Sequence, residues 1–223
     1  MTTITTTTDR AALLHLQAWL SPAFPTGGFA YSHGLEWAIE AGDITDGESL
    51  LAWASDVLAH GSGHSDAVLL RHAHRSASDP TTLRAIAELA LAATPSRERR
   101  DEALNQGRAF LLAVATWLPG RLPDDLPYAV AVGAAAGIHA IPEDATTAAY
   151  LQAFAANLIS AAVRAVPLGQ TTGLRVLAAL EPTILATADQ TADATLDDIG
   201  GCAFRSDLAA MRHETQYTRL FRS

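Results

Sequence analysis

The chain of 223 residues contains no lysine, and all 15 of its basic residues are arginine. This absence excludes the GxxxxGK phosphate-binding loop, a Schiff-base lysine and the phosphate-orienting lysine of kinases. The 24 acidic residues outnumber the basic ones and give a net charge of -9. A chain without concentrated positive charge binds nucleic acid poorly, because phosphate contacts need such charge. We therefore expect no nucleic-acid partner, and we expect any nucleotide to be bound by another protein.

Cysteine and long apolar runs are also scarce. Cys202 is the single cysteine, which excludes an internal disulfide or a thiolate metal cluster within one chain and fits a reducing compartment. No histidine signature marks a base for it, so a catalytic cysteine is disfavoured. No stretch approaches the roughly 20 apolar residues of a membrane span, and Met1–Arg10 has no secretion signal. The sequence predicts a cytoplasmic protein that does not contact a membrane.

Runs of β-branched and aromatic residues, which favour strands, are scarce, whereas alanine, the best helix former, is abundant. The sequence therefore predicts an all-α, single-domain bundle of roughly ten helices. We expect a disordered segment over 1–8, an all-helical domain over 9–210 and a C-terminal tail over 211–223. The expected helices cover 9–20, 31–41, a segment from Asp46 broken at Gly61 and Gly63, 65–75, a segment from Asp79-Pro80, 97–117, 128–139, 143–166, 171–180, 183–188 and 204–212.

The segment Leu118–Pro127 carries three prolines. Such a segment is typical either of a hinge between two halves or of an ordinary surface connection, and the sequence leaves both open. The mixed-charge run Ser96–Glu102 is equally ambiguous. It opens a helix and is typical of a solvated face with local ion pairs, although a partner could bind there.

Eight histidines form the main candidate chemistry. His60 and His64 are four residues apart, which on a helix places both on one face, as a metal pair with Asp66 would need. The glycines between them argue against a rigid helix, and His72 and His74 point in different directions. A metal-binding helical protein that uses the His60–His74 stretch is therefore kept only as the alternative function. In the favoured interpretation, we expect no metal site and no catalytic residue.

The C-terminal tail, Met211–Ser223, combines arginines with Tyr217, Leu220 and Phe221. Chain ends are usually polar and frayed, whereas arginine with aromatic residues is typical of an interface hot spot. Two readings remain open, namely a segment that becomes ordered on docking to a partner and a tail that folds back on its own core.

Four blocks of the sequence together resemble the UreF family of urease accessory proteins. They follow the family order and span nearly the whole chain. The blocks are 21–36 (SPAFPTGGFAYSHGLE), 97–100 (RERR) with 106–110 (QGRAF), 166–173 (VPLGQTTG) and 212–223 (RHETQYTRLFRS). The motif residues that we expect to matter for structure are Pro22, Gly28, Tyr31, Ser32, Gly34, Gly169, Gln170 and Gly173.

The resemblance implies an all-helical chaperone that is not an enzyme and that helps to assemble the nickel centre of urease. It implies a complex with UreD (UreH in some organisms), with the GTPase UreG and with apo-urease, and a homodimer within that complex. Nickel and GTP are expected on the partner proteins, so this chain needs no cofactor of its own. It acts as a scaffold, which could also line a path for nickel, or it tunes GTP hydrolysis through an arginine; we favour the scaffold.

The resemblance also implies roles for individual residues. Glu36, Arg164 and, more weakly, Glu98 match charged positions that bear on UreG. The position of Arg164 is lysine in some related proteins, and arginine keeps the charge with a different hydrogen-bond geometry. The residues expected to dock UreD/UreH are Arg212, His213, Glu214, Tyr217, Arg219, Leu220, Phe221 and Arg222.

Overall fold

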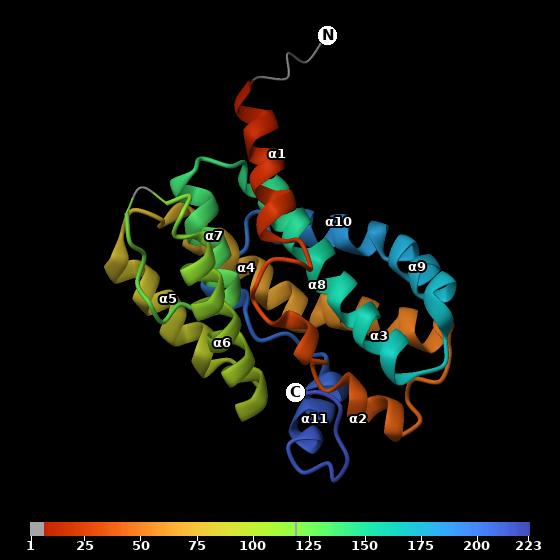
Figure 1. The fold of residues 1–223 in the computed structure, drawn as a ribbon. Coiled ribbons are helices and arrows are strands. Elements are labelled where there is room, and N and C mark those ends of the chain that lie inside the picture. Colours follow the sequence, from red (N-terminus) through yellow and green to blue (C-terminus); the bar gives the residue numbers. More distant parts are fainter. Residues whose placement is uncertain (1–6, 119) are drawn as a thin grey trace.

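The structure is a computed structural model that describes residues 7–118 and 120–223, and these residues form helices and no strand (Figure 1). The all-α prediction is confirmed. The predicted disorder of 1–8 falls mostly on 1–6, outside the described residues, whereas Thr7 and Thr8 belong to the first helix. The α-helices are α1 (Thr7–Trp19), α2 (Leu35–Glu40), α3 (Gly47–His60), α4 (Ser62–Arg75), α5 (Pro80–Ala92), α6 (Arg97–Val114), α7 (Tyr128–Ile138), α8 (Glu143–Ala165), α9 (Gly169–Ala179), α10 (Glu181–Gln190) and α11 (Phe204–His213), with 3-10 turns η1 (Gly28–Ala30) and η2 (Leu196–Asp198).

Three helix starts follow the capping chemistry of the sequence. Asp46 accepts a hydrogen bond from the backbone N–H of Ser49 and completes a capping box at α3. Asp79 caps α5, with proline in the first turn, and Ser96 caps α6. Each cap satisfies backbone N–H groups that have no partner inside the helix.

Other boundaries were predicted wrongly. The first helix begins at Thr7 rather than at Asp9, and Gly63 lies inside α4, so only Gly61 breaks that segment. The predicted 31–41 helix starts four residues late, because Gly34 adopts a left-handed conformation (φ 76°). Pro182 lies in the first turn of a ten-residue α10 rather than before a short piece. Proline is tolerated there, since the first N–H groups of a helix have no internal partner.

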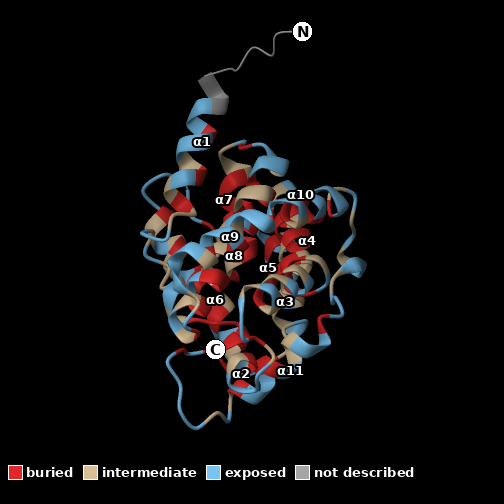
Figure 2. Ribbon diagram, turned by 90° about the vertical axis from the view of Figure 1, so that its right-hand side faces the viewer, coloured by how far each residue is buried: buried red, intermediate tan, exposed pale blue. Residues whose placement is uncertain are grey.

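The core is centred on α4, α7 and α8, and Figure 2 shows buried residues gathered on α4 and α7 at the middle of the bundle. Helix α7 is buried along most of its length. A side chain at Gly133 would lie 2.2 Å from the carbonyl oxygen of Leu70 on α4. Alanine and glycine therefore allow these two backbones to approach closely, which is the structural use of the alanine-rich composition.

The proline-rich segment connects α6 to α7. These two helices pack against each other, and Leu122 and Leu126 from the connection are buried in the same core. The structure therefore favours a surface connection over a hinge for this segment.

Helix α11 packs on α2 and touches α6. A side chain at Gly34 would lie 2.5 Å from the backbone nitrogen of Ala210, so glycine is required for both the turn and the contact. The chain end then returns to lie beside α2 and α11 at one end of the molecule (Figure 1).

A candidate partner-docking site around the C-terminal tail

The C-terminal tail folds back onto the domain, in agreement with the second of the two readings left open by the sequence. The backbone N–H of Arg222 donates to the carbonyl of Ala30 at 2.8 Å, and the N–H of Ser32 donates to the carbonyl of Ser223 at 2.8 Å. Phe221 and Ser223 are buried. The tail thus forms a short pairing with the 30–32 segment of the N-terminal motif.

Glu36, in the first turn of α2, anchors this tail. Its Oε1 accepts from the N–H of Leu220 at 2.6 Å, and its Oε2 accepts from the N–H of Phe221 at 3.0 Å. The residue is 8% exposed. Both oxygens of the carboxylate that the resemblance relates to UreG are therefore engaged inside the chain.

His213, at the end of α11, is completely buried between two carboxylates. Its Nδ1 lies 2.6 Å from Glu98 on α6, and its Nε2 lies 3.2 Å from Glu36. Glu98 also accepts a hydrogen bond from Arg219 at 2.6 Å. We call Glu36, Glu98, His213 and Arg219 the tail cluster.

Arg164, near the end of α8, also contacts the tail. Its guanidinium carbon lies 4.5 Å from the centroid of the Phe221 ring, and its Nε donates to the carbonyl of Ser160. Partial burial lowers the pKa of the Arg164 side chain. The structure therefore brings Glu36, Glu98 and Arg164, which the resemblance relates to UreG, into contact with the tail, which it relates to UreD/UreH.

The rest of the tail points outward. Tyr217 is fully exposed and Leu220 is 74% exposed, and Arg212 and Arg222 are also exposed. Glu214 is half-buried and accepts a hydrogen bond from the N–H of Arg97. These exposed side chains are the part of the tail that a partner can reach.

An exposed apolar stripe on α11, which we did not predict, extends this surface. Phe204, Leu208 and Met211 are exposed although large and apolar. Their spacing of four and three residues places them on one face of the helix, opposite the buried Ala209, Ala210 and His213. The spacing of these residues is visible in the sequence, but the sequence alone predicts only a short helix before the tail and does not indicate which of its faces is covered.

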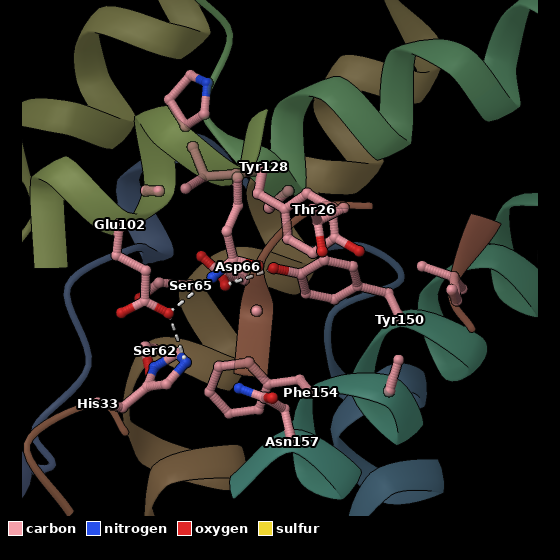
Figure 3. A pocket seen from close by; sticks show the side chains of 18 of the residues that line it. Thr26, His33, Ser62, Ser65, Asp66, Glu102, Tyr128, Tyr150, Phe154 and Asn157 are labelled. Atoms are coloured by element: carbon pink, nitrogen blue, oxygen red, sulfur yellow. Dashed lines mark hydrogen bonds and ion pairs between the residues drawn. The ribbon is translucent and has the colours of Figure 1, made fainter. Parts of the chain in front are cut away.

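A cavity of about 630 Å³ lies beneath the N-terminal motif, lined by α1, α4, α6, α8 and the loop before η1. Its polar end is shown in Figure 3, where Glu102 faces His33. His33 Nε2 lies 2.9 Å from Glu102, which also pairs with Arg99 and accepts from the hydroxyl of Ser223 at 2.7 Å. Burial opposes ionisation of Glu102, but Arg99, His33 and Ser223 outweigh it and hold its pKa at about 2.

Asp66, considered above as a metal ligand, lies on the wall of this cavity and accepts a hydrogen bond from the hydroxyl of Tyr150 at 2.8 Å (Figure 3). Burial raises the pKa of Asp66 to about 6, although Arg99 and the Tyr150 hydroxyl act in the opposite direction. The imidazole of His33 has a buried Nδ1 with no hydrogen-bond partner.

Two histidines of the predicted metal stretch, His72 and His74, have structural partners, whereas His60 is exposed and His64 is partly buried. His72 Nε2 lies 3.1 Å from the carbonyl of Ala194, and His74 Nε2 lies 2.7 Å from the carbonyl of Ile141. Over 7–118 and 120–223, no three His, Cys, Asp or Glu side chains come close enough together to hold a metal ion. The described residues therefore give the metal-binding alternative no support.

Several motif residues have clear packing roles. Tyr31 is buried, and the hydroxyl of the fully buried Ser32 donates to the carbonyl of Ser223. A side chain at Gly173 would lie 2.6 Å from Val163, so glycine lets α9 approach α8. The Gly28 position lies close to Gln106.

The other motif residues lie at the surface or in a turn. Gly169 has φ 71° and opens α9. Pro22 and Gln170 are exposed. None of the helices in the part of the chain that the structure describes is long and apolar enough to cross a membrane.

Comparison with known proteins gives a consistent result. The UreF family model matches residues 44–181. A urease accessory protein UreF of Rhodopseudomonas palustris (strain BisB18) is 51% identical over 223 residues, covering 96% of this chain and 92% of the relative. Proteins of the same description from Bradyrhizobium sp. (strain BTAi1) and Xanthobacter autotrophicus are 54% and 53% identical, over 96% and 95% of this chain and 93% and 91% of their own lengths.

Proposed function

The chain belongs to the UreF family of urease accessory proteins, a non-catalytic chaperone family that takes part in urease maturation, and we propose that it works there as a scaffold. In this proposal it holds UreD/UreH and the GTPase UreG together on apo-urease while nickel is inserted. Nickel and GTP are carried by the partner proteins, and the complex assembles in the cytoplasm. The observation that carries the proposal is the packed tail, which presents an exposed surface at a fixed place.

The docking surface for UreD/UreH consists of the outward side of the tail and the α11 stripe. Exposed apolar side chains beside arginines are typical of interface hot spots. Leu220, Tyr217 and Arg222 supply such a group on the tail, and Phe204, Leu208 and Met211 supply the adjoining apolar stripe. A partner that covers this area buries large apolar groups that otherwise face water.

In this proposal, the residues that the resemblance relates to UreG act by shaping the surface that the GTPase contacts. Arg164 lies over Phe221 and Glu36 is buried beneath the tail, so both support the surface rather than reach far beyond it. This arrangement favours a scaffold over an arginine that enters the GTPase site. A homodimer is part of the proposal, and the exposed Leu13 and Leu14 on α1 offer an apolar patch for it.

Co-purification of the chain with UreD/UreH, UreG and apo-urease tests the proposal. Deleting 212–223 is expected to abolish UreD/UreH capture, but it also removes the buried Phe221. Leu220→Asp is therefore the sharper variant, since Leu220 is exposed and its backbone contact to Glu36 remains. The matched control is Leu112→Asp on α6, because Leu112 is 82% exposed and lies far from the tail in the sequence.

We expect Leu220→Asp to lose UreD/UreH at least tenfold, with unchanged helicity by circular dichroism, and Leu112→Asp to capture it normally. Equal capture by Leu220→Asp and the unaltered chain would contradict the docking role of the tail. Failure of the unaltered chain to capture any of the three partners would contradict the scaffold itself.

A further inference from the structure

The His213 ring lies between two hydrogen-bond acceptors. Its two nitrogens face Oε2 of Glu98 and Oε2 of Glu36, at 2.6 and 3.2 Å. A carboxylate only accepts hydrogen bonds, and a neutral imidazole has one N–H and one lone pair. A neutral ring would therefore place its lone pair against a carboxylate oxygen, whereas the imidazolium form donates to both.

The other groups around the ring are consistent with a bound proton. Glu36 also accepts the N–H groups of Leu220 and Phe221, and Glu98 also accepts from Arg219. These donors favour the ionised form of a carboxylate, so the proton resides on the ring. If a carboxyl group held it instead, the cluster would still contain one proton more than with a neutral ring.

The balance of charges in the tail cluster also indicates that the His213 ring is protonated. With the ring protonated, the positive charges of His213 and Arg219 match the negative charges of Glu36 and Glu98. The nearby tail contacts, from Arg97 to Glu214 and from Gln216 to Glu40, lie outside this set. Loss of the ring proton would leave one uncompensated negative charge at a site where His213 is fully buried, and unpaired buried charge is strongly unfavourable.

We propose that the tail cluster is a proton-dependent latch, in which the protonated His213 joins Glu36 to Glu98 and fixes the tail in its docking conformation. His213 is then a positioning residue rather than a partner contact. This inference rests on the proposed function and adds a regulation to it, because the docking surface is complete only while the tail is packed. The sign follows from linkage: packing is favoured at lower pH and weakens as pH rises, by at most about tenfold per pH unit for one proton.

A spin label on the isolated, full-length chain tests the latch without any partner. Tyr217→Cys in a Cys202→Ser background puts the label on a fully exposed tail position and removes the one other cysteine. We expect an immobile label at pH 6 and a growing mobile fraction up to pH 9. His60→Gln, at an exposed histidine, is the matched control and should leave this pH profile unchanged.

Two further variants separate a proton latch from a merely structural contact. His213→Gln carries both of its N–H donors on one nitrogen, so it cannot span the two carboxylates as the ring does, and its label should be mobile at every pH. Glu98→Gln should instead remove the pH dependence and keep the label immobile at pH 9, because an amide can donate to the unprotonated Nδ1 and still accept from Arg219. If His213→Gln fails to fold, the Glu98→Gln result still decides.

Equal mobility of the label at pH 6 and pH 9 in the Tyr217→Cys, Cys202→Ser chain, whether mobile or immobile, would overturn the latch, as would ¹⁵N shifts showing a singly protonated His213 in the packed tail. Capture of UreD/UreH at both pH values is measured alongside with the unlabelled chain, which keeps Tyr217. Capture that persists without any change in tail mobility would reject the latch and leave the proposed scaffold standing, whereas no capture at either pH would reject the scaffold.

Discussion

The guanidinium of Arg164 lies over the ring of Phe221, 57 residues further along the chain, at 4.5 Å from the ring centroid. This stacking places the end of α8 against the end of the chain. A cation over an aromatic face contributes about 0.5–1 kcal/mol at an exposed site and more where water is excluded. Arg164 therefore helps to set the position of Phe221, and through it the course of the tail.

Replacing Arg164 with alanine should loosen the tail without unfolding the domain. We expect the amides of Leu220 and Phe221 to exchange with solvent about threefold faster, since roughly 0.5–1 kcal/mol of stacking is lost. Hydrogen exchange measured by mass spectrometry reports this directly. The exchange rates in Arg164→Lys should lie between those of the unaltered chain and those of the alanine variant. Unchanged exchange in the alanine variant would show that the stacking does not hold the tail.

Gly34→Ala should be severely destabilising. The new methyl group would lie 2.5 Å from the backbone nitrogen of Ala210, and φ is 76°. A left-handed backbone costs a side chain about 1–2 kcal/mol, and the clash with α11 adds to this. The control is Gly42→Ala, which has a similar φ of 81° in open space. Denaturant unfolding should show a larger loss for Gly34→Ala, and equal losses would contradict the contact.

Asp66→Asn should stabilise the protein at neutral pH. Burial raises the pKa of Asp66 to about 6, against about 3.9 in an unfolded chain. Folding therefore binds a proton here, so stability is complete below pH 4 and is lost as pH rises to 6. The loss is about 3 kcal/mol as an upper bound. The free energy of unfolding should change more between pH 4 and pH 7 for the unaltered chain than for Asp66→Asn. An equal change in both proteins would contradict the raised pKa.

Glu102→Gln should act in the opposite direction. The pKa of Glu102 is held at about 2, against about 4.3 in an unfolded chain. Its contribution is therefore present above pH 4 and disappears as pH falls through 2. Removing one charge of a buried pair costs about 3–5 kcal/mol, so the variant should unfold at lower denaturant at pH 7 and differ less at pH 2.5. A constant difference across this range would contradict the ionised state of Glu102.

Much of the fold was accessible from local chemistry. Asp46, Asp79 and Ser96 are strong helix caps, and their helices begin where the sequence predicts. The errors arose where backbone geometry depends on distant contacts. Nothing near Gly34 in the sequence reveals that α11 packs against it, and the left-handed turn there shortens α2.

The candidate site was accessible only in part. The composition of the tail indicated a special segment, and the resemblance selected Glu36, Glu98 and Arg164. That these residues hold the tail depends on contacts across more than 50 residues of chain, which no local pattern encodes. The burial of His213 is of the same kind, because a histidine beside arginines in a sequence gives no sign of two carboxylates contributed by α2 and α6.

The hydrogen bonds between Ser32 and Ser223 join positions 191 residues apart. Contacts of such long range form late, because the loop between them must first be ordered. During synthesis the 30–36 segment emerges early, and it cannot form these contacts until residues 220–223 have left the ribosome. Glu36 and Glu102 lack their tail donors during that interval, so a chain that stops before residue 220 lacks the contacts that fix the tail. The surface that we propose for docking therefore forms only after residues 220–223 have been added.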